Sequence, residues 1–148
     1  MALKTLLFLL LGTLVVGEAT YDRPEGAPEP VSNPDKDKSV VKIVNYVIDD
    51  INAQRRLNKT SPLVLVQVLE ATKQVVAGFL YEVTFAAGEA RCPPQKRRKY
   101  NVRRDRCSLF PSGEMRIYKV EVLDVAWEKP QKQILKKDVL YSFYYSSK

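Results

Sequence analysis

The sequence contains no histidine. Imidazole is the base in both Ser-His-Asp and Cys-His catalytic systems, so its absence excludes both classes of hydrolase. Two cysteines without any histidine also fall short of the ligands that a zinc site needs. The sequence has no paired-carboxylate or phosphate-loop motif either. We therefore expect a protein that is not an enzyme and that uses no metal and no cofactor.

Cysteine is scarce as well. The chain has only Cys92 and Cys107, so a single intramolecular disulfide pairing exists. Disulfides form and persist in oxidising compartments. The cysteine content therefore fits a protein of the secretory pathway.

The N-terminus has the layout of a secretory signal peptide. Lys4 gives it a positive start, an apolar run extends from Leu6 to Val16, and small residues follow at Gly17 and Ala19. That run of about 11 residues is short of the roughly 20 that a membrane-spanning helix needs. We expect a signal peptide over residues 1–19 and a secreted, extracellular product.

The next segments predict an arm and a helix. Residues 20–38 contain four prolines and few apolar residues, which favours a flexible or extended N-terminal arm. After Ser39, apolar residues recur at three- and four-residue intervals, which predicts an amphipathic helix with Ser39 as its N-cap. The polar segment 58–62 ends this helix. The apolar positions are Val40, Ile43, Val44, Val47, Ile48 and Ile51.

The rest of the chain predicts strands. From Leu63 the periodicity becomes two, so that Leu63, Leu65, Leu69 and Ala71 are expected to share one face. Three more strand-like runs cover residues 79–87, 115–126 and 135–145. Consecutive strands joined by short links favour an antiparallel meander. The prediction is an α+β domain over residues 39–148, with one amphipathic helix packed across a four- to five-stranded antiparallel sheet.

Three separated features resemble the cystatin family. Gly26 lies about a dozen residues before the predicted helix, where the family carries its N-terminal glycine. Residues 74–78, Gln-Val-Val-Ala-Gly, match the family's Gln-x-Val-x-Gly hairpin in full. Trp127 follows a late strand, where the family has a hairpin that contains Pro-Trp. The chain is thus similar to a secreted, type-2-like cystatin with a single disulfide, and the resemblance implies the cystatin-like fold over the whole mature chain.

The resemblance implies a reversible, non-covalent, competitive inhibitor of papain-like cysteine proteases such as cathepsins. In the family, the arm and two hairpin loops line up at one end of the sheet and enter the active-site cleft. A glycine lets the backbone approach a surface closely, and a preorganised loop loses little entropy on docking. The implied protease-binding residues are Gly26, Gln74, Val75, Val76, Ala77, Gly78, Ala126 and Trp127.

Each of these features also has a plain structural interpretation. The pentapeptide can be a tight turn, Gly26 a linker glycine, and Trp127 a partly buried core residue. The competing function is a secreted basic binding or antimicrobial module on a cystatin scaffold, with weak or no inhibition. Proteins of that kind have usually lost the Gln-x-Val-x-Gly motif from their sequence, and the motif is intact here. A monomer is expected, and a domain-swapped dimer that exchanges the helix and first strand is an open alternative.

The chain departs from the family pattern at three places. Ala126 replaces the proline before the tryptophan, which leaves the loop less rigid. Pro24 and Glu25 precede Gly26 where the family has bulky apolar residues, so the arm should contribute less to binding or favour a protease with a basic subsite. The family's second disulfide has no counterpart near Tyr118 or Val139, which predicts lower stability unless packing, for example by the late tyrosines and Phe143, compensates.

Asn58 has three interpretations. Asn58-Lys59-Thr60 is an N-glycosylation sequon. Some cystatins use an asparagine in this loop to inhibit legumain, which a glycan would block. The third interpretation is an asparagine that only ends the helix.

The net charge of +7 is concentrated between the cysteines, since residues 93–106 hold seven cations and one anion. This loop is either a solvated loop or a patch for anionic glycans or membrane surfaces. No nucleic acid partner is expected for a secreted protein. The basic residues are Lys96, Arg97, Arg98, Lys99, Arg103, Arg104 and Arg106.

Overall fold

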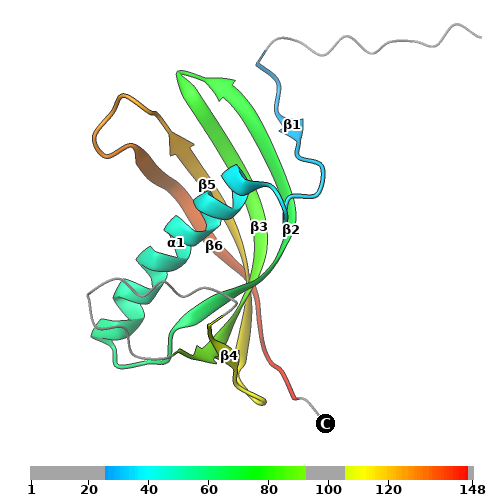
Figure 1. Ribbon diagram of the computed structural model, residues 1–148, viewed down its shortest axis with the longest axis vertical. Helices are drawn as coiled ribbons and strands as arrows, with labels where there is room; N and C mark the ends of the chain where they lie inside the picture. Colours follow the sequence, from blue (N-terminus) through cyan, green and yellow to red (C-terminus); the bar gives the residue numbers. More distant parts are fainter. Residues whose placement is uncertain (1–25, 93–105, 147–148) are drawn as a thin grey trace, which may run out of the picture.

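The computed structural model describes residues 26–92 and 106–146. The expected signal peptide, the first part of the arm and most of the basic loop lie outside the described residues. The elements run in the order shown in Figure 1. They are β1 (Glu29–Pro30), α1 (Lys38–Leu57), β2 (Leu63–Val76), β3 (Gly78–Arg91), β4 (Ser108–Leu109), β5 (Glu114–Asp124) and β6 (Lys132–Tyr144).

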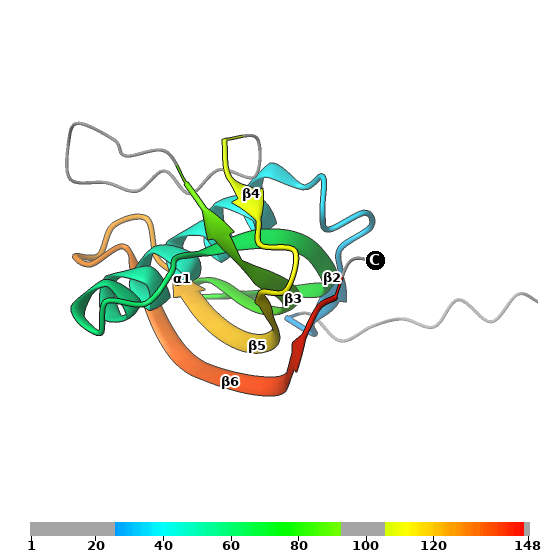
Figure 2. The same cartoon turned by 90° about the horizontal axis from the view of Figure 1, so that it is seen from below.

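All strand pairs are antiparallel, and the sheet has the order β1-β2-β3-β5-β6, with the short β4 added to β3. The four long strands confirm the expected meander, and two two-residue strands extend it. Helix α1 lies across one face of the sheet, which curls around it (Figures 1 and 2). The α+β prediction of one helix on an antiparallel sheet is therefore confirmed. In the described part of the chain, no helix has the length and apolar character to cross a membrane.

The apolar stripe of α1 forms the core together with the inner face of the sheet. Val40, Val44 and Val47 are fully buried, and the rings of Phe85 and Tyr118 stack with centroids 5.4 Å apart beneath the helix. The predicted N-cap is wrong by two residues. The Asp37 side chain, not that of Ser39, accepts hydrogen bonds from the first free backbone N–H groups, so the helix begins at Lys38.

The predicted alternation along β2 is also wrong at Leu69, which is 42% exposed. The pairing of β2 with β3 shifts register between Leu65 and Gln67 and again between Val68 and Glu70. A bulge inserts a residue and inverts the alternation that follows it. Val68 therefore points into the core, where strict alternation from Leu63 would place Leu69.

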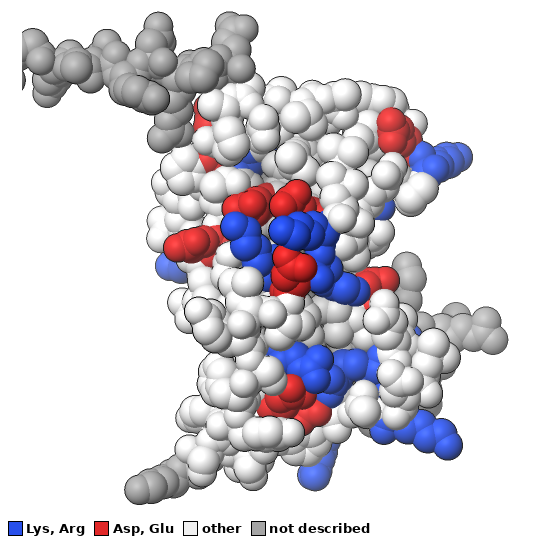
Figure 3. Space-filling model, turned by 180° about the vertical axis from the view of Figure 1, so that it is seen from behind, with Lys and Arg blue, Asp and Glu red and all other residues white. Residues whose placement is uncertain are grey.

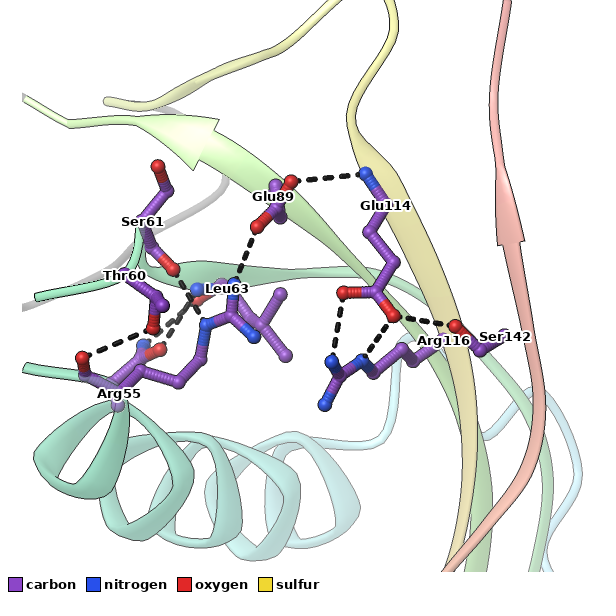
Figure 4. A network of polar contacts seen from close by, with 9 residues as sticks. Arg55, Thr60, Ser61, Leu63, Glu89, Glu114, Arg116 and Ser142 are labelled. Atoms are coloured by element: carbon purple, nitrogen blue, oxygen red, sulfur yellow. Dashed lines mark hydrogen bonds and ion pairs between the residues drawn. The ribbon is translucent and has the colours of Figure 1, made fainter. Parts of the chain in front are cut away.

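A polar network ties the end of α1 to the sheet (Figure 4). The Asn52 carboxamide donates to the Leu63 carbonyl and accepts from its N–H, both at 2.8 Å. Arg55 donates to the carboxylate of Glu89 and to the carbonyl of Ser61. These buried groups are fully paired, so they fix the position of α1 over β2 and β3.

Strand β6 is the edge of the sheet, and its late aromatic residues do not join the core. The side chains of Tyr141, Phe143, Tyr144 and Tyr145 are all exposed, so they do not supply the packing that could replace a second bridge, and lower stability stays the prediction. The helix lies over β2 and β3 and does not cover this strand. Two polar contacts join β6 to α1 instead: Lys137 pairs with Asp50 at 2.6 Å, and the Tyr46 hydroxyl donates to the Lys132 carbonyl.

The Cys92–Cys107 disulfide is present, as expected from the two cysteines. It joins the end of β3 to the start of β4, beside the paired residues Arg91 and Ser108. Tyr118 and Val139 are directly opposite each other on β5 and β6. An aromatic and a β-branched side chain thus face each other at the place where the sequence lacks a second pair of cysteines.

Candidate functional site

Three segments that are distant in the sequence meet at one end of the sheet. They are the arm from Gly26, the β2–β3 hairpin and the loop 125–131 between β5 and β6 (Figure 1). The helix C-terminus and β4 lie at the other end. The structure therefore brings all the residues that resemble the cystatin protease-binding set to this end of the sheet. We call the end formed by the arm, the β2–β3 hairpin and the loop 125–131 the candidate edge.

The first hairpin is tighter than the sequence indicated. The pentapeptide was expected to link two strands, but β2 continues to Val76, β3 starts at Gly78, and only Ala77 forms the turn. Val75 is opposite Phe79 and Val76 is opposite Gly78. Val75 is 64% and Val76 41% exposed, so strand pairing holds two apolar side chains in solvent.

Gly78 joins the first hairpin to the second loop. Its φ is +114°, a conformation that L side chains rarely adopt. A Cβ at this position would lie 2.6 Å from the Asp124 carbonyl oxygen and 3.0 Å from Cγ2 of Val125. Only a glycine allows the two loops to approach this closely without displacement.

The second loop presents the single tryptophan. The Glu128 N–H donates to the Val125 carbonyl at 3.1 Å, which closes a β-turn with Ala126 and Trp127 at its centre. The Val125 N–H donates to the Gln131 carbonyl at 2.8 Å and closes the base of the loop. The Trp127 side chain is 73% exposed, so it is not a core residue. The Lys129–Pro130 peptide bond in the same loop is cis.

The described part of the arm lies along β2 and does not extend freely from the domain. Glu29 pairs with Lys73 and Pro30 with Thr72, and the Val31 N–H donates to the Ala71 carbonyl at 2.9 Å. Of the two expected conformations, flexible or extended, this part of the arm has the extended one, and strand pairing holds residues 29–31 on the sheet. The few residues between the prolines gave no strand signal, and their pairing partners lie 44 and 42 positions further along the chain.

Sequence analysis did not single out Phe79 and Lys73, which extend this edge. Phe79 follows the hairpin glycine, is 39% exposed, and has the Lys73 ammonium 3.9 Å from its ring centroid. A cation at this distance over an aromatic face is attracted to it. The sequence signal that could have identified Phe79 as a site residue is its position directly after the hairpin glycine.

The outer face of the sheet contrasts with this end (Figure 3). Charged side chains of both signs gather across its middle, and the end with the hairpin is largely uncharged. Lys119 pairs with Glu82 at 3.0 Å, and Lys136 pairs with Asp138 at 3.2 Å. Exposed pairs of this kind contribute little to stability, but they neutralise one another. The hairpin end therefore carries few charges beside its exposed Val75, Val76 and Trp127, while a second group of exposed apolar side chains lies along β6.

The remaining predicted site residues lie elsewhere. Asn58 is exposed and forms the C-cap of α1, with its N–H donating to the Gln54 carbonyl. The helix-ending role is confirmed, and the residue is at the end of the molecule away from the hairpin. Arg106 is exposed beside the disulfide. The other basic residues, 96–104, lie outside the described residues.

The fold and this edge define a small α+β protein that presents paired apolar loops at one end. A model of the cystatin domain matches residues 26–102, more than half of the chain, and the chain therefore belongs to the cystatin family. Members of this family are in general protein inhibitors of cysteine proteases and not enzymes.

Two solved structures share the fold. The structure of dimeric human cystatin F superposes with a TM-score of 0.59 at 16% sequence identity, covering 88% of this chain and 97% of that one. The salivary cystatin from the soft tick Ornithodoros moubata gives the same TM-score and identity, covering 80% of this chain and all of that one. No curated protein sequence matches this chain significantly.

Proposed function

We propose that this chain is a reversible, non-covalent, competitive inhibitor of papain-like cysteine proteases of the cathepsin type. The contact surface comprises the arm at Gly26, the hairpin Gln74–Gly78 and the turn at Ala126 and Trp127. One observation carries the proposal. The exposed Val75, Val76 and Trp127 project from two loops that Gly78 holds in direct contact.

The geometry suits a wedge that enters a cleft. Strand pairing up to Val76 and the closed turn at Trp127 leave little backbone entropy to lose on docking. Small apolar side chains in the hairpin desolvate at low cost, and an exposed tryptophan is a typical anchor in protein interfaces. The absence of histidine supports an inhibitor without hydrolytic activity of its own.

Tight-binding titration of papain and two cathepsins tests this proposal. Wild-type protein should inhibit, and Trp127→Ala should weaken inhibition roughly 30-fold, as expected for an interface anchor worth about 2 kcal/mol. Tyr144→Ala is the matched control, because Tyr144 is equally exposed but lies on β6. If all three proteases remain fully active at micromolar inhibitor, the proposal fails, and the basic binding module becomes the better interpretation.

We further propose that the chain is secreted after removal of residues 1–19 and that Asn58 is available for modification or binding. The side chain is exposed, and Thr60 of the sequon donates from its hydroxyl to the Arg55 carbonyl. Mass measurement of protein secreted by eukaryotic cells, with Asn58→Gln as control, tests for the glycan. Assay of the unglycosylated protein against legumain tests the alternative role.

A further inference from the structure

The arm and the first hairpin are joined by one side chain. The Gln74 carboxamide Nε2 donates to the carbonyl oxygen of Gly26 at 2.7 Å, across 48 positions of sequence. Gly26 has a φ of +81°, and a Cβ there would lie 3.6 Å from the Val75 carbonyl. The chain therefore turns at Gly26 directly against the hairpin strand.

Backbone pairing alone does not hold Gly26 in this position. Within the described residues, the arm pairs with β2 at Glu29, Pro30 and Val31, and no backbone hydrogen bond joins Gly26, Ala27 or Pro28 to the sheet. The Gln74 amide is the polar contact that continues the attachment from β1 to the hairpin. Pro28 adds an apolar contribution, since it lines a shallow cavity together with Gln74 and Leu80.

We propose that Gln74 is a positioning residue that holds the arm against the first hairpin, so that Gly26 and the residues before it meet the protease in a fixed place. This inference rests on the proposed function and deepens it. The hairpin that carries Gln74 remains part of the contact surface, and the role proposed for the Gln74 carboxamide is to act through the arm. Its contribution is preorganisation, because an arm already held on the hairpin loses less entropy when the protease binds.

The expected effect is modest, since the hydrogen bond lies at the surface. Loss of one such bond lowers the equilibrium constant for attachment of the arm to the hairpin by roughly 2- to 10-fold. We expect Gln74→Leu, which keeps the size of the side chain but removes the donor, to weaken inhibition of papain by this factor. Gln67→Leu is the matched control on the same strand, because Gln67 is exposed and remote from the candidate edge.

A double-mutant cycle separates positioning from direct contact. In protein truncated to begin at Ala27, Gln74→Leu should have no further effect on the inhibition constant, because the acceptor carbonyl of Gly26 is gone. If Gln74→Leu weakens inhibition equally in the full-length and truncated proteins, Gln74 contacts the protease directly. If it does not weaken inhibition by the full-length protein, the hydrogen bond to Gly26 contributes nothing to binding. Either result overturns the inference.

Amide hydrogen exchange gives a readout that needs no protease. Gln74→Leu should speed exchange in the free protein at the Glu29 amide and at the Val31 amide, which donates to the Ala71 carbonyl, while amides in α1 stay unchanged. If the chain inhibits no protease but exchange in the arm rises, the proposed function fails and the attachment stands. If exchange in the arm is unchanged, the attachment itself is refuted.

Discussion

Gly78 lies against the carbonyl of Asp124 so closely that a β-carbon would sit 2.6 Å from that oxygen. The contact joins the first residue of β3 to the last residue of β5, which pairs with Phe79. Because both loops of the candidate edge start at this point, their relative position is set by backbone and not by side chains. The glycine of the pentapeptide is thus required by the fold before any protease binds.

Gly78→Ala should therefore destabilise the protein. A positive φ and a clash with backbone atoms together cost about 1 to 3 kcal/mol. Gly26→Ala is the matched control, since Gly26 also has a positive φ but a Cβ there would make only an ordinary contact, 3.6 Å from the Val75 carbonyl oxygen. Urea unfolding should show the larger loss for Gly78→Ala, and equal losses would mean that the close approach to Asp124 does not matter.

Ala126→Pro should make the second loop more rigid. Ala126 is the second residue of the turn Val125–Glu128, the position that proline favours. We expect a gain of about 0.4 to 1 kcal/mol in unfolding free energy and tighter inhibition of papain. Glu128→Pro provides the contrast, because it removes the N–H that closes the turn. A destabilised Ala126→Pro variant would contradict this account.

Deletion of residues 20–26 should weaken inhibition by well under a thousandfold. Glu25 precedes Gly26, and a carboxylate that enters an apolar subsite costs free energy unless it is paired. The arm should therefore contribute less here than the two loops do. The comparison is the inhibition constant for papain before and after the deletion, with Glu25→Leu expected to strengthen binding of the full-length chain. A thousandfold loss on deletion would refute the prediction.

The Glu114 carboxylate should stabilise the fold in a pH-dependent way. Hydrogen bonds from the Arg116 guanidinium, both at 2.8 Å, together with one from Ser142, hold the pKa of Glu114 below its usual range. A group with a lowered pKa stabilises the folded state above the unfolded value of about 4.3, and this contribution is lost as the pH falls through the folded value.

Glu114→Gln tests this linkage. The variant should be less stable than wild type by about 1 kcal/mol between pH 5 and 8. The difference should shrink as the pH falls through the lowered pKa of Glu114, where the wild-type carboxylate takes up a proton. Urea titrations at several pH values measure it. A difference that stays constant down to pH 2 would show that the ionised form of Glu114 is not what stabilises the fold.

Local patterns in the sequence were sufficient for the helix and the four long strands. Apolar residues recur every three or four positions from Val40 to Ile51 and every second position in β3, because those faces are buried. The burial of both faces confirms the helix and the strand. Leu69 was assigned wrongly, because a bulge depends on the register with a neighbouring strand. The N-cap was misplaced since both Asp37 and Ser39 have capping side chains, and only the chain path into the helix selects between them.

The sequence by itself determined the helix, the four long strands, the single disulfide and the residues of the pentapeptide, but not the short strands β1 and β4. Only the tertiary structure decided that Gly26 bonds to Gln74, that Gly78 meets Asp124, and that the late aromatic residues of β6 stay exposed. The physical reason is range. Periodicity and turn chemistry act between residues a few positions apart, while the assembly of an edge from three segments depends on sheet order and twist, which no local window of sequence contains.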